Sequence, residues 1–425
     1  MTHPFRTGPL NVSFVITSLP VGGAETLLVN LVRRINKTIL QPEVLCLKEP
    51  GELGDAIALE VPLTGRVLSH KCDLRVMPRL MRAFRRSRTD AVITVGAGDK
   101  MFWGRLAARL AGVPVVCSAL HSTGWPDGIG KLNRLLTGIT DGFIACAQNH
   151  AHHLHAHEGF PANKVFMIPN GVDVDRFRPF APMRGWLREH LDVPTTSRLV
   201  GIVAALRPEK NHAQLIAAAS EIIRHHPNTH FVVVGDGPMR AAIESEIQQR
   251  GLVGHFHLLG NRSDTPAILA GLDVFVLTSK NEANPVSILE ALASAIPVVS
   301  PDVGSVNETV IHEKTGLLTR PLDANSTADA IIRLLGNPTW ASQLGFQGRS
   351  HVRQSWSLEA MVSGYERLVT MLYNSKSAIN GQPLWQAAGE ESAIDPFRTH
   401  PQAPLTASCL PTVDQPVLAN FSPQD

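Results

Sequence analysis

The stretch VFVLTSKNEANPVSILEALASAIPVVS, residues 274–300, carries the pattern that decides the fold. Residues 274–278 and 297–300 are short apolar runs that predict buried strands, and helix-start residues lie between them. Two continuous apolar strands joined by one helix favour neighbours in a parallel sheet that helices cover on both faces. This stretch therefore predicts one repeat of a doubly wound α/β sheet.

The same alternation runs along most of the chain and falls into two sets. Further candidate strands are residues 12–17, 43–47, 91–95, 114–118, 142–146 and 165–168, and then 199–204, 231–234 and 256–259. Residues 169–196, between the sets, are rich in turn residues and broken by prolines. We predict two doubly wound parallel-sheet domains that face each other across a cleft, where such sheets bind ligands beyond the carboxyl ends of their strands.

Domain limits follow from these two sets and from the composition of the C-terminus. We expect a first domain at residues 1–175, a second at 176–356 and an amphipathic helix at 357–374. Residues 375–425 are rich in proline and small polar residues without periodicity, so we expect a disordered tail.

The composition excludes several functions. A formal net charge of +2 and an aromatic content of 5% argue against a nucleic-acid partner. The chain has five cysteines without C-x-x-C spacing, which favours a reducing compartment over a disulfide framework. No signal peptide and no run of 18 apolar residues is found, so we expect a cytoplasmic protein without a membrane span.

The helix start within the opening stretch predicts a phosphate site. Asn284 is a good N-cap residue, and Pro285 suits the first helical position. The next amides, on Val286 and Ser287, would then point out of the positive end of the helix, where phosphate is the usual guest.

Two carboxylates flank that site in the sequence. Glu282 and Glu290 cannot hold phosphate, because like charges repel, so hydroxyl groups are the expected partners. A ligand with phosphates in the middle and hydroxylated rings at both ends is a nucleotide sugar.

Three other loops carry candidate residues at strand ends. Gly22 and Gly23 allow a tight strand-to-helix turn, although an ordinary turn would use them too. Arg207 and Lys210 place two cations at the cleft, and a solvated loop is the alternative. His121 follows a first-domain strand and could contact a sugar hydroxyl, although a lone histidine is more often structural.

In this order the motifs resemble glycosyltransferase family 4, the retaining, glycogen synthase-like nucleotide-sugar transferases with the GT-B fold. The motifs are GGAE (22–25), PNGVDVDRF (169–177), LRPEKN (206–211), VGDGP (234–238), LLGNRSD (258–264), EANPVSILE (282–290), PVVSPDVGSVNETV (297–310) and TGLL (315–318). The Glu-x7-Glu block in this context is specific, whereas a single glycine motif is not.

The resemblance implies roles for the donor-side residues. By it, Arg207 and Lys210 grip the donor diphosphate, Glu282 lies beside the donor sugar, and Glu290 holds the ribose hydroxyls. The backbone of Val286 and Ser287 would face the phosphates.

The resemblance also implies contacts from three other loops. Gly23 would let the first domain approach the donor, and His121 would contact the donor sugar. Asn261 and Arg262 would form part of the base pocket. Many relatives have Gly-Phe-Gly after the first glutamate, whereas this chain has Ala-Asn-Pro at 283–285, which leaves the donor identity open.

We therefore expect a retaining glycosyltransferase that moves a sugar from a nucleotide-diphosphate donor to a glycan, lipid-linked or small-molecule acceptor. By the resemblance, the pathway would be cell-surface polysaccharide or glycolipid synthesis, including lipopolysaccharide, with UDP as the expected carrier and GDP as the alternative. Helix amides and the two cations can stabilise a leaving diphosphate, and no D-x-D cluster is placed for Mg²⁺ at this site, so we expect no metal or cofactor. The alternatives are a nucleotide-sugar epimerase or hydrolase of the same fold and a non-catalytic nucleotide-sugar-binding protein.

One segment of the first domain suggests peripheral contact with an anionic membrane. Leu80, Met81 and Phe84 form an apolar strip at helical spacing within DLRVMPRLMRAFRRSRTD, residues 73–90. The alternative is that this strip packs on the sheet and the arginines are solvated. The arginines run from Arg75 to Arg88: Arg75, Arg79, Arg82, Arg85, Arg86 and Arg88.

Overall fold

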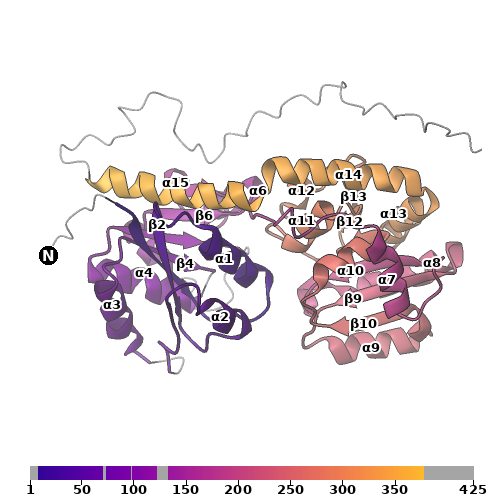
Figure 1. Cartoon of the computed structure of the whole chain (residues 1–425), viewed down its shortest axis with the longest axis horizontal. Helices are drawn as coiled ribbons and strands as arrows, with labels where there is room; N and C mark the ends of the chain where they lie inside the picture. The colour runs from indigo at the N-terminus through magenta and orange to yellow at the C-terminus, as the bar shows by residue number, and fades with distance from the viewer. Residues whose placement is uncertain (1–7, 70–72, 97, 122–132, 378–425) are drawn as a thin grey trace, which may run out of the picture.

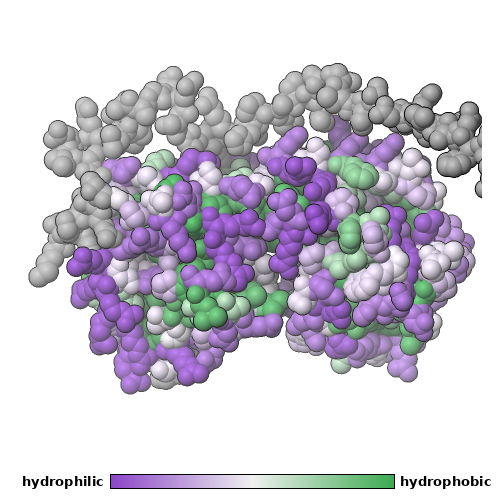
Figure 2. Space-filling view, viewed as in Figure 1, coloured by the Kyte–Doolittle hydropathy of each residue, from purple (hydrophilic) through white to green (hydrophobic). Residues whose placement is uncertain are grey.

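The computed structural model describes residues 8–69, 73–96, 98–121 and 133–377, and it forms two lobes (Figure 1). Each lobe is built on one parallel sheet with helices on both faces, so the predicted doubly wound architecture is confirmed. The surface in Figure 2 is largely hydrophilic and is notched between the lobes, on the edge away from α14 and α15.

The first lobe holds a seven-stranded sheet in the order β3-β2-β1-β4-β5-β6-β7. Its strands are β1 (Leu10–Ile16), β2 (Leu40–Cys46), β3 (Leu63–Thr64), β4 (Ala91–Val95), β5 (Val115–Ala119), β6 (Gly142–Ala145) and β7 (Val165–Met167). Its helices are α1 (Gly23–Arg34), α2 (Glu52–Ile57), α3 (Val76–Arg86), α4 (Asp99–Ala111) and α6 (Gln148–Ala156), with 3-10 turns η1 (Leu136–Ile139) and η2 (Ala162–Lys164).

The second lobe holds a six-stranded sheet in the order β10-β9-β8-β11-β12-β13. Its strands are β8 (Arg198–Val203), β9 (Thr229–Val234), β10 (Phe256–Gly260), β11 (Val274–Val276), β12 (Val298–Pro301) and β13 (Gly316–Thr319). Its helices are α7 (Pro182–His190), α8 (His212–His225), α9 (Arg240–Gln249), α10 (Thr265–Gly271), α11 (Val286–Ala293), α12 (Val306–Thr309), α13 (Ala324–Gly336) and α14 (Pro338–Ser355), with 3-10 turns η3 (Pro208–Lys210) and η4 (Val253–His255).

The burial of the strands explains why continuous apolar runs predicted them. Every residue of β4 is buried, and successive side chains enter different cores, since Ile93 packs with α1 and α15 whereas Val92 packs with α3 and α4. A strand covered on both faces must be apolar on both faces, so it reads as a continuous run. Two of the edge strands, β3 and β13, were not predicted, because Leu63–Thr64 and Gly316–Thr319 lack such a run.

The chain crosses between the lobes twice, at adjacent points. Val172 lies in the first crossover. Its N donates to Trp356 O at 2.9 Å, and its O accepts from Leu358 N at 3.2 Å, both in the second crossover. The last helix, α15 (Leu358–Ser377), then lies along the first lobe (Figure 1). It continues past the expected end at residue 374, and within it Lys376 pairs with Asp141 at 2.6 Å. The predicted tail, beyond residue 377, lies outside the described residues.

Helix α3 does not present an apolar strip to solvent. Leu80 is 0% exposed and Phe84 is 1% exposed, because both pack into the core between α3, α4 and the sheet, and Met81 packs against that core. The alternative, that the strip packs on the sheet, is therefore confirmed, and the strip is not available to a membrane. Arg82, Arg85 and Arg86 are exposed. Within the described residues no helix is both long and apolar enough to cross a bilayer.

Candidate functional site

The start of α11 lies one residue later than predicted. Pro285 is the N-cap, with φ −74° and ψ 118°, and the first helical bond runs from Ile288 N to Pro285 O at 3.2 Å. The amides of Val286 and Ser287 precede that bond, so they remain donors at the positive end of the helix dipole. The predicted Asn284 cap is wrong, since no side chain caps the helix, and the Asn284 side-chain nitrogen donates to Thr309 Oγ1 at 3.1 Å.

Lys210 and Glu282 meet beyond the carboxyl ends of neighbouring strands β8 and β11. The Lys210 ammonium donates to Glu282 Oε1, and the two side chains are only 24% and 10% exposed. Two further hydrogen bonds join the loops: Lys280 N donates to Glu209 O at 2.9 Å, and the Thr278 hydroxyl, Oγ1, donates to Lys210 O at 3.1 Å. Two of the predicted site residues thus form one ion pair.

Arg207 differs from Lys210 in having no carboxylate partner among the residues that the structure describes. It is exposed and precedes the η3 turn that ends at Lys210. Its guanidinium makes no hydrogen bond or ion pair with the part of the chain that the structure describes. A planar, unneutralised guanidinium at a strand end is suited to a phosphate, to which it can donate two parallel hydrogen bonds.

Glu290 lies in α11, one turn beyond the free amides. Burial raises the pKa of its carboxyl to about 7, against a smaller opposite effect of the Arg176 guanidinium. Its carboxyl accepts no hydrogen bond from the described residues. Near neutral pH this group is close to half-protonated, and hydroxyl donors from a ligand would favour the carboxylate.

His121 follows β5 and is tied to α11 through Asn170. Burial lowers the pKa of His121 to about 4, partly offset by a hydrogen bond with the Asn170 side chain, and its Nδ1 is buried without a partner among the described residues. The Asn170 amide nitrogen in turn donates to Asn284 O at 2.9 Å, just before α11. Asn170, in the PNGVDVDRF motif, thus links the two lobes, a role that the motif alone did not predict.

The glycine loop of the first lobe lies against the start of α11. A Cβ placed on Gly23 would lie 3.8 Å from Val286 Cγ2, so the starts of α1 and α11 are neighbours. Gly22 is extended, with φ −166°, which any residue adopts. Proximity rather than backbone conformation therefore marks this loop as part of the site.

The predicted base-pocket residues are less well placed. Arg262 is engaged by Asp264, through Nε to Oδ1 at 2.8 Å and Nη2 to Oδ2 at 2.6 Å, and Asn261 is exposed. The neighbouring Gly235 has φ +131° and a Cβ there would overlap Ala204 O, so this glycine is needed for loop packing. Asp264, which holds Arg262, was not among the predicted site residues.

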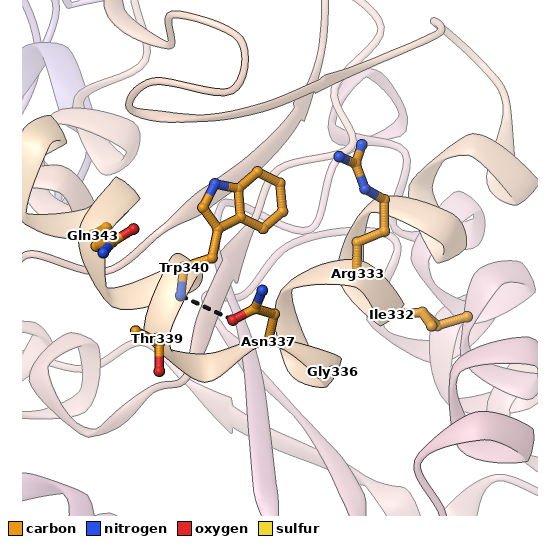
Figure 3. A pocket seen from close by; sticks show the side chains of 7 residues that line it. All are labelled: Ile332, Arg333, Gly336, Asn337, Thr339, Trp340 and Gln343. Atoms are coloured by element: carbon orange, nitrogen blue, oxygen red, sulfur yellow. Dashed lines mark hydrogen bonds between the residues drawn. The ribbon is translucent and has the colours of Figure 1, made fainter.

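A separate pocket of about 690 Å³ lies where α13 meets α14 (Figure 3). Arg333 lies over the Trp340 ring at 5.1 Å and pairs with Glu313 at 2.7 Å, and Trp340 N donates to Asn337 Oδ1 at 3.1 Å. None of the predicted site residues lines this pocket, so it is distinct from the candidate site.

Comparisons with known proteins identify the family of both lobes. Residues 21–176 match the model of glycosyltransferase family 4, and residues 186–351 match that of glycosyl transferases group 1. The UDP-Gal:alpha-D-GlcNAc-diphosphoundecaprenol alpha-1,3-galactosyltransferase of Escherichia coli is 32% identical over 307 residues, covering 68% of this chain and 79% of that protein. A GDP-mannose-dependent alpha-(1-6)-phosphatidylinositol monomannoside mannosyltransferase of Mycobacterium tuberculosis is 29% identical over 270 residues, covering 60% and 69%. Among solved structures, HepE of Anabaena in complex with UDP and glucose has a TM-score of 0.75 at 20% identity, covering 85% of this chain and 99% of that one.

Proposed function

The chain belongs to glycosyltransferase family 4, and we propose that it transfers a sugar, with retention, from a nucleotide-diphosphate donor to a lipid-linked acceptor. One observation supports this best. The free amides of Val286 and Ser287 begin a helix that carries Glu290, and they follow directly on the loop in which Glu282 is paired with Lys210. Hydrogen-bond donors suited to phosphate and carboxylates suited to hydroxyl groups thus occur together beyond the end of one strand.

In this proposal the donor diphosphate lies on the start of α11. The two amides, Arg207 and Lys210 stabilise the negative charge that develops as the diphosphate leaves, so no metal is needed. The ribose hydroxyls donate to Glu290. UDP is the proposed carrier and GDP the alternative, since the named donors of relatives include both.

Retention follows from attack on the same face as the leaving group. The bond between the anomeric carbon and the diphosphate oxygen breaks, the acceptor oxygen bonds to that carbon, and the acceptor proton passes to the leaving phosphate. Lys210 also neutralises Glu282, which would otherwise repel the diphosphate. His121 is neutral at physiological pH because burial lowers its pKa, so its imidazole has one nitrogen able to accept a hydrogen bond from a sugar hydroxyl.

A lipid-linked acceptor is proposed from two observations. The named acceptors of the relatives above are a diphosphoundecaprenol-linked sugar and a phosphatidylinositol mannoside. Arg82, Arg85 and Arg86 also leave three exposed cations on α3, whose apolar side is buried. We propose that the protein contacts the cytoplasmic face of an anionic membrane electrostatically, in polysaccharide, lipopolysaccharide or glycolipid synthesis.

The test combines donor binding with product analysis. Nucleoside diphosphates are screened by thermal stabilisation, where a ligand at 100 times its Kd adds about 2.7 kcal/mol. UDP- and GDP-sugars are then incubated with lipid diphosphate-linked acceptors, with and without EDTA, and the anomeric configuration is read by NMR. Acceptor-dependent α-linked product in EDTA supports the proposal. Inverted product, dependence on added Mg²⁺, or equal donor turnover without acceptor contradicts it, the last in favour of a hydrolase or epimerase.

A further inference from the structure

The N-terminus of α6 in the first lobe is capped from the second lobe. Glu308 of α12 accepts Gln148 N through Oε2 at 2.8 Å and Asn149 N through Oε1 at 2.6 Å, across 160 positions of sequence. The helix supplies no cap of its own, because its N-cap residue is Ala147 and its first turn holds no acidic residue. Glu308 therefore provides the hydrogen-bond acceptors and the negative charge that this helix end lacks.

The same contact is reinforced by the Asn149 side chain. Its amide nitrogen donates to Asn307 Oδ1 at 3.0 Å and lies 3.3 Å from Gly304 O. Burial raises the pKa of Glu308, whereas the two amides act in the opposite direction. A carboxylate that is costly to bury is retained here only because two amides receive it.

Residues 304–308, which include the capping Glu308, also contact the backbone of Glu282. Ser305 N donates to Glu282 O at 3.1 Å, and Gly304 has φ +57° with so close an approach that a Cβ there would overlap Glu282 O. The α6 N-terminus is thus linked to Glu282 through two sets of hydrogen bonds, those from the α6 amides to Glu308 and the one from Ser305 N to Glu282 O. A shift of Glu308 relative to α6 would be transmitted directly to Glu282.

The contact lies beside the two chain crossovers. In Figure 1, α6 and α12 are neighbours next to the point where the chain passes from α14 into α15, and the notch in Figure 2 lies on the opposite edge. The Val172 and Ser357 backbones pair at the same junction. Because the contact lies close to the crossovers, a small displacement within it corresponds to a much larger displacement at the far edges of the two lobes.

We propose that Glu308 is a positioning residue: its carboxylate, held by the two amides of α6, sets the angle between the lobes and thereby places Glu282 opposite the first lobe. The kinetic part of this inference rests on the proposed function. The phosphate-binding groups all belong to the second lobe, so loosening the contact leaves nucleotide affinity intact. Turnover falls, because transfer requires His121 and the acceptor on the first lobe to be aligned with the donor on the second lobe.

Two variants remove the contact from its opposite sides. Glu308→Gln removes the charge and one of the two carboxylate acceptors. Gln148→Pro removes one of the two donating amides and leaves the Glu308 and Asn149 side chains unchanged. Proline is tolerated at the first helical position, and Ala147 before it is extended, with φ −161° and ψ 164°, as a residue preceding proline requires. The matched controls are Gln148→Ala, which keeps the amide, and Glu313→Gln, an exposed carboxylate paired with Arg333.

The kinetic readout separates kcat from donor binding. We expect kcat to fall about 10- to 100-fold in Glu308→Gln and in Gln148→Pro, with the donor KM and the Kd of the free nucleoside diphosphate within about twofold of the parent. The double variant should cost little more than the worse single variant, since both break one contact. A Gln148→Pro enzyme with the kcat of Gln148→Ala, or additive losses, overturns the proposal.

A second readout does not depend on sugar transfer. Fluorescent labels on the two lobes of the full chain report their distance distribution by single-molecule energy transfer, which should broaden in both variants and stay as in the parent in both controls. If this occurs while no donor is turned over by the parent, the positioning role stands and the proposed function fails. An unchanged distribution in both variants overturns the positioning role, whatever the activity.

Discussion

Lys210 and Glu282 form an ion pair across 72 positions of sequence, at the carboxyl ends of two neighbouring parallel strands. The pair places a cation where a leaving diphosphate needs one, and it neutralises the glutamate closest to that site. The neighbouring Arg207 has no carboxylate partner among the described residues, so the two cations of the LRPEKN motif have different surroundings.

Removing either cation should reduce turnover. We expect Arg207→Ala and Lys210→Ala each to lower kcat about 100- to 1000-fold, because both groups act on charge that develops in the transition state. Lys210→Ala should also lower the melting temperature, since it leaves Glu282 largely buried and unpaired. Lys314→Ala, an exposed lysine elsewhere in the second lobe, is the control, and near-parent kcat in both site variants would refute the assignment.

Glu290 should make stability depend on pH. Its folded-state pKa of about 7 lies above the usual carboxyl value, so between these two values the folded protein binds more protons than the unfolded chain. The free energy of unfolding from this group therefore falls as the pH rises from about 4.5 to about 7. Urea unfolding should show a smaller fall in Glu290→Gln, and a parent slope identical to that of the variant would contradict the raised pKa.

Nucleotide binding should release a proton from the same carboxyl. Ribose hydroxyls donate to the carboxylate, so binding lowers the Glu290 pKa and affinity weakens as the pH falls below 7. Calorimetry of UDP or GDP binding in buffers of different ionisation enthalpy measures this release directly. No proton release in the parent at pH 6.5, or the same release in Glu290→Gln, would show that another group holds the ribose.

The end of α15 should be needed up to Lys376. Lys376 Nζ donates to Pro114 O at 2.6 Å and pairs with Asp141, so a chain ending at Ser375 loses both contacts, about 1 kcal/mol. A chain ending at Ser377 keeps them and should unfold at the same temperature as the full chain. Lys376→Met in the full chain should match the shorter truncation, and a large loss on cutting at Ser377 would mean that later residues stabilise the fold.

Membrane contact should be electrostatic only. Changing Arg82, Arg85 and Arg86 to Ser removes three exposed cations from α3, which would weaken binding to anionic vesicles by about 3 kcal/mol at low salt. Flotation with phosphatidylglycerol vesicles measures this, and added salt should abolish binding in the parent because the apolar side of α3 is buried. Equal flotation of parent and variant, or a parent that does not float, removes α3 from the proposal.

Much of the fold was predictable because its signals are local. Strands covered on both faces must be apolar along their whole length, which is why β4 was predicted at its observed limits. The start of α11 was predicted to within one residue from its proline, although the Asn284 side chain bonds to Thr309 instead of capping the helix. The strip on α3 could not be assigned from sequence, because helical spacing shows that a face is apolar but not whether the sheet or a membrane covers it.

The sequence alone determined two doubly wound domains and the residue types that gather at their strand ends, because alternation, turn residues and short motifs depend only on neighbours along the chain. Only the tertiary structure decided which of these residues meet. The Lys210–Glu282 pair, the Asn170 bond to Asn284 and the Glu308 cap on α6 join residues 72, 114 and 160 positions apart. Such contacts depend on how strands order themselves in a sheet and how two lobes are set at their junction, and packing of the whole chain determines both.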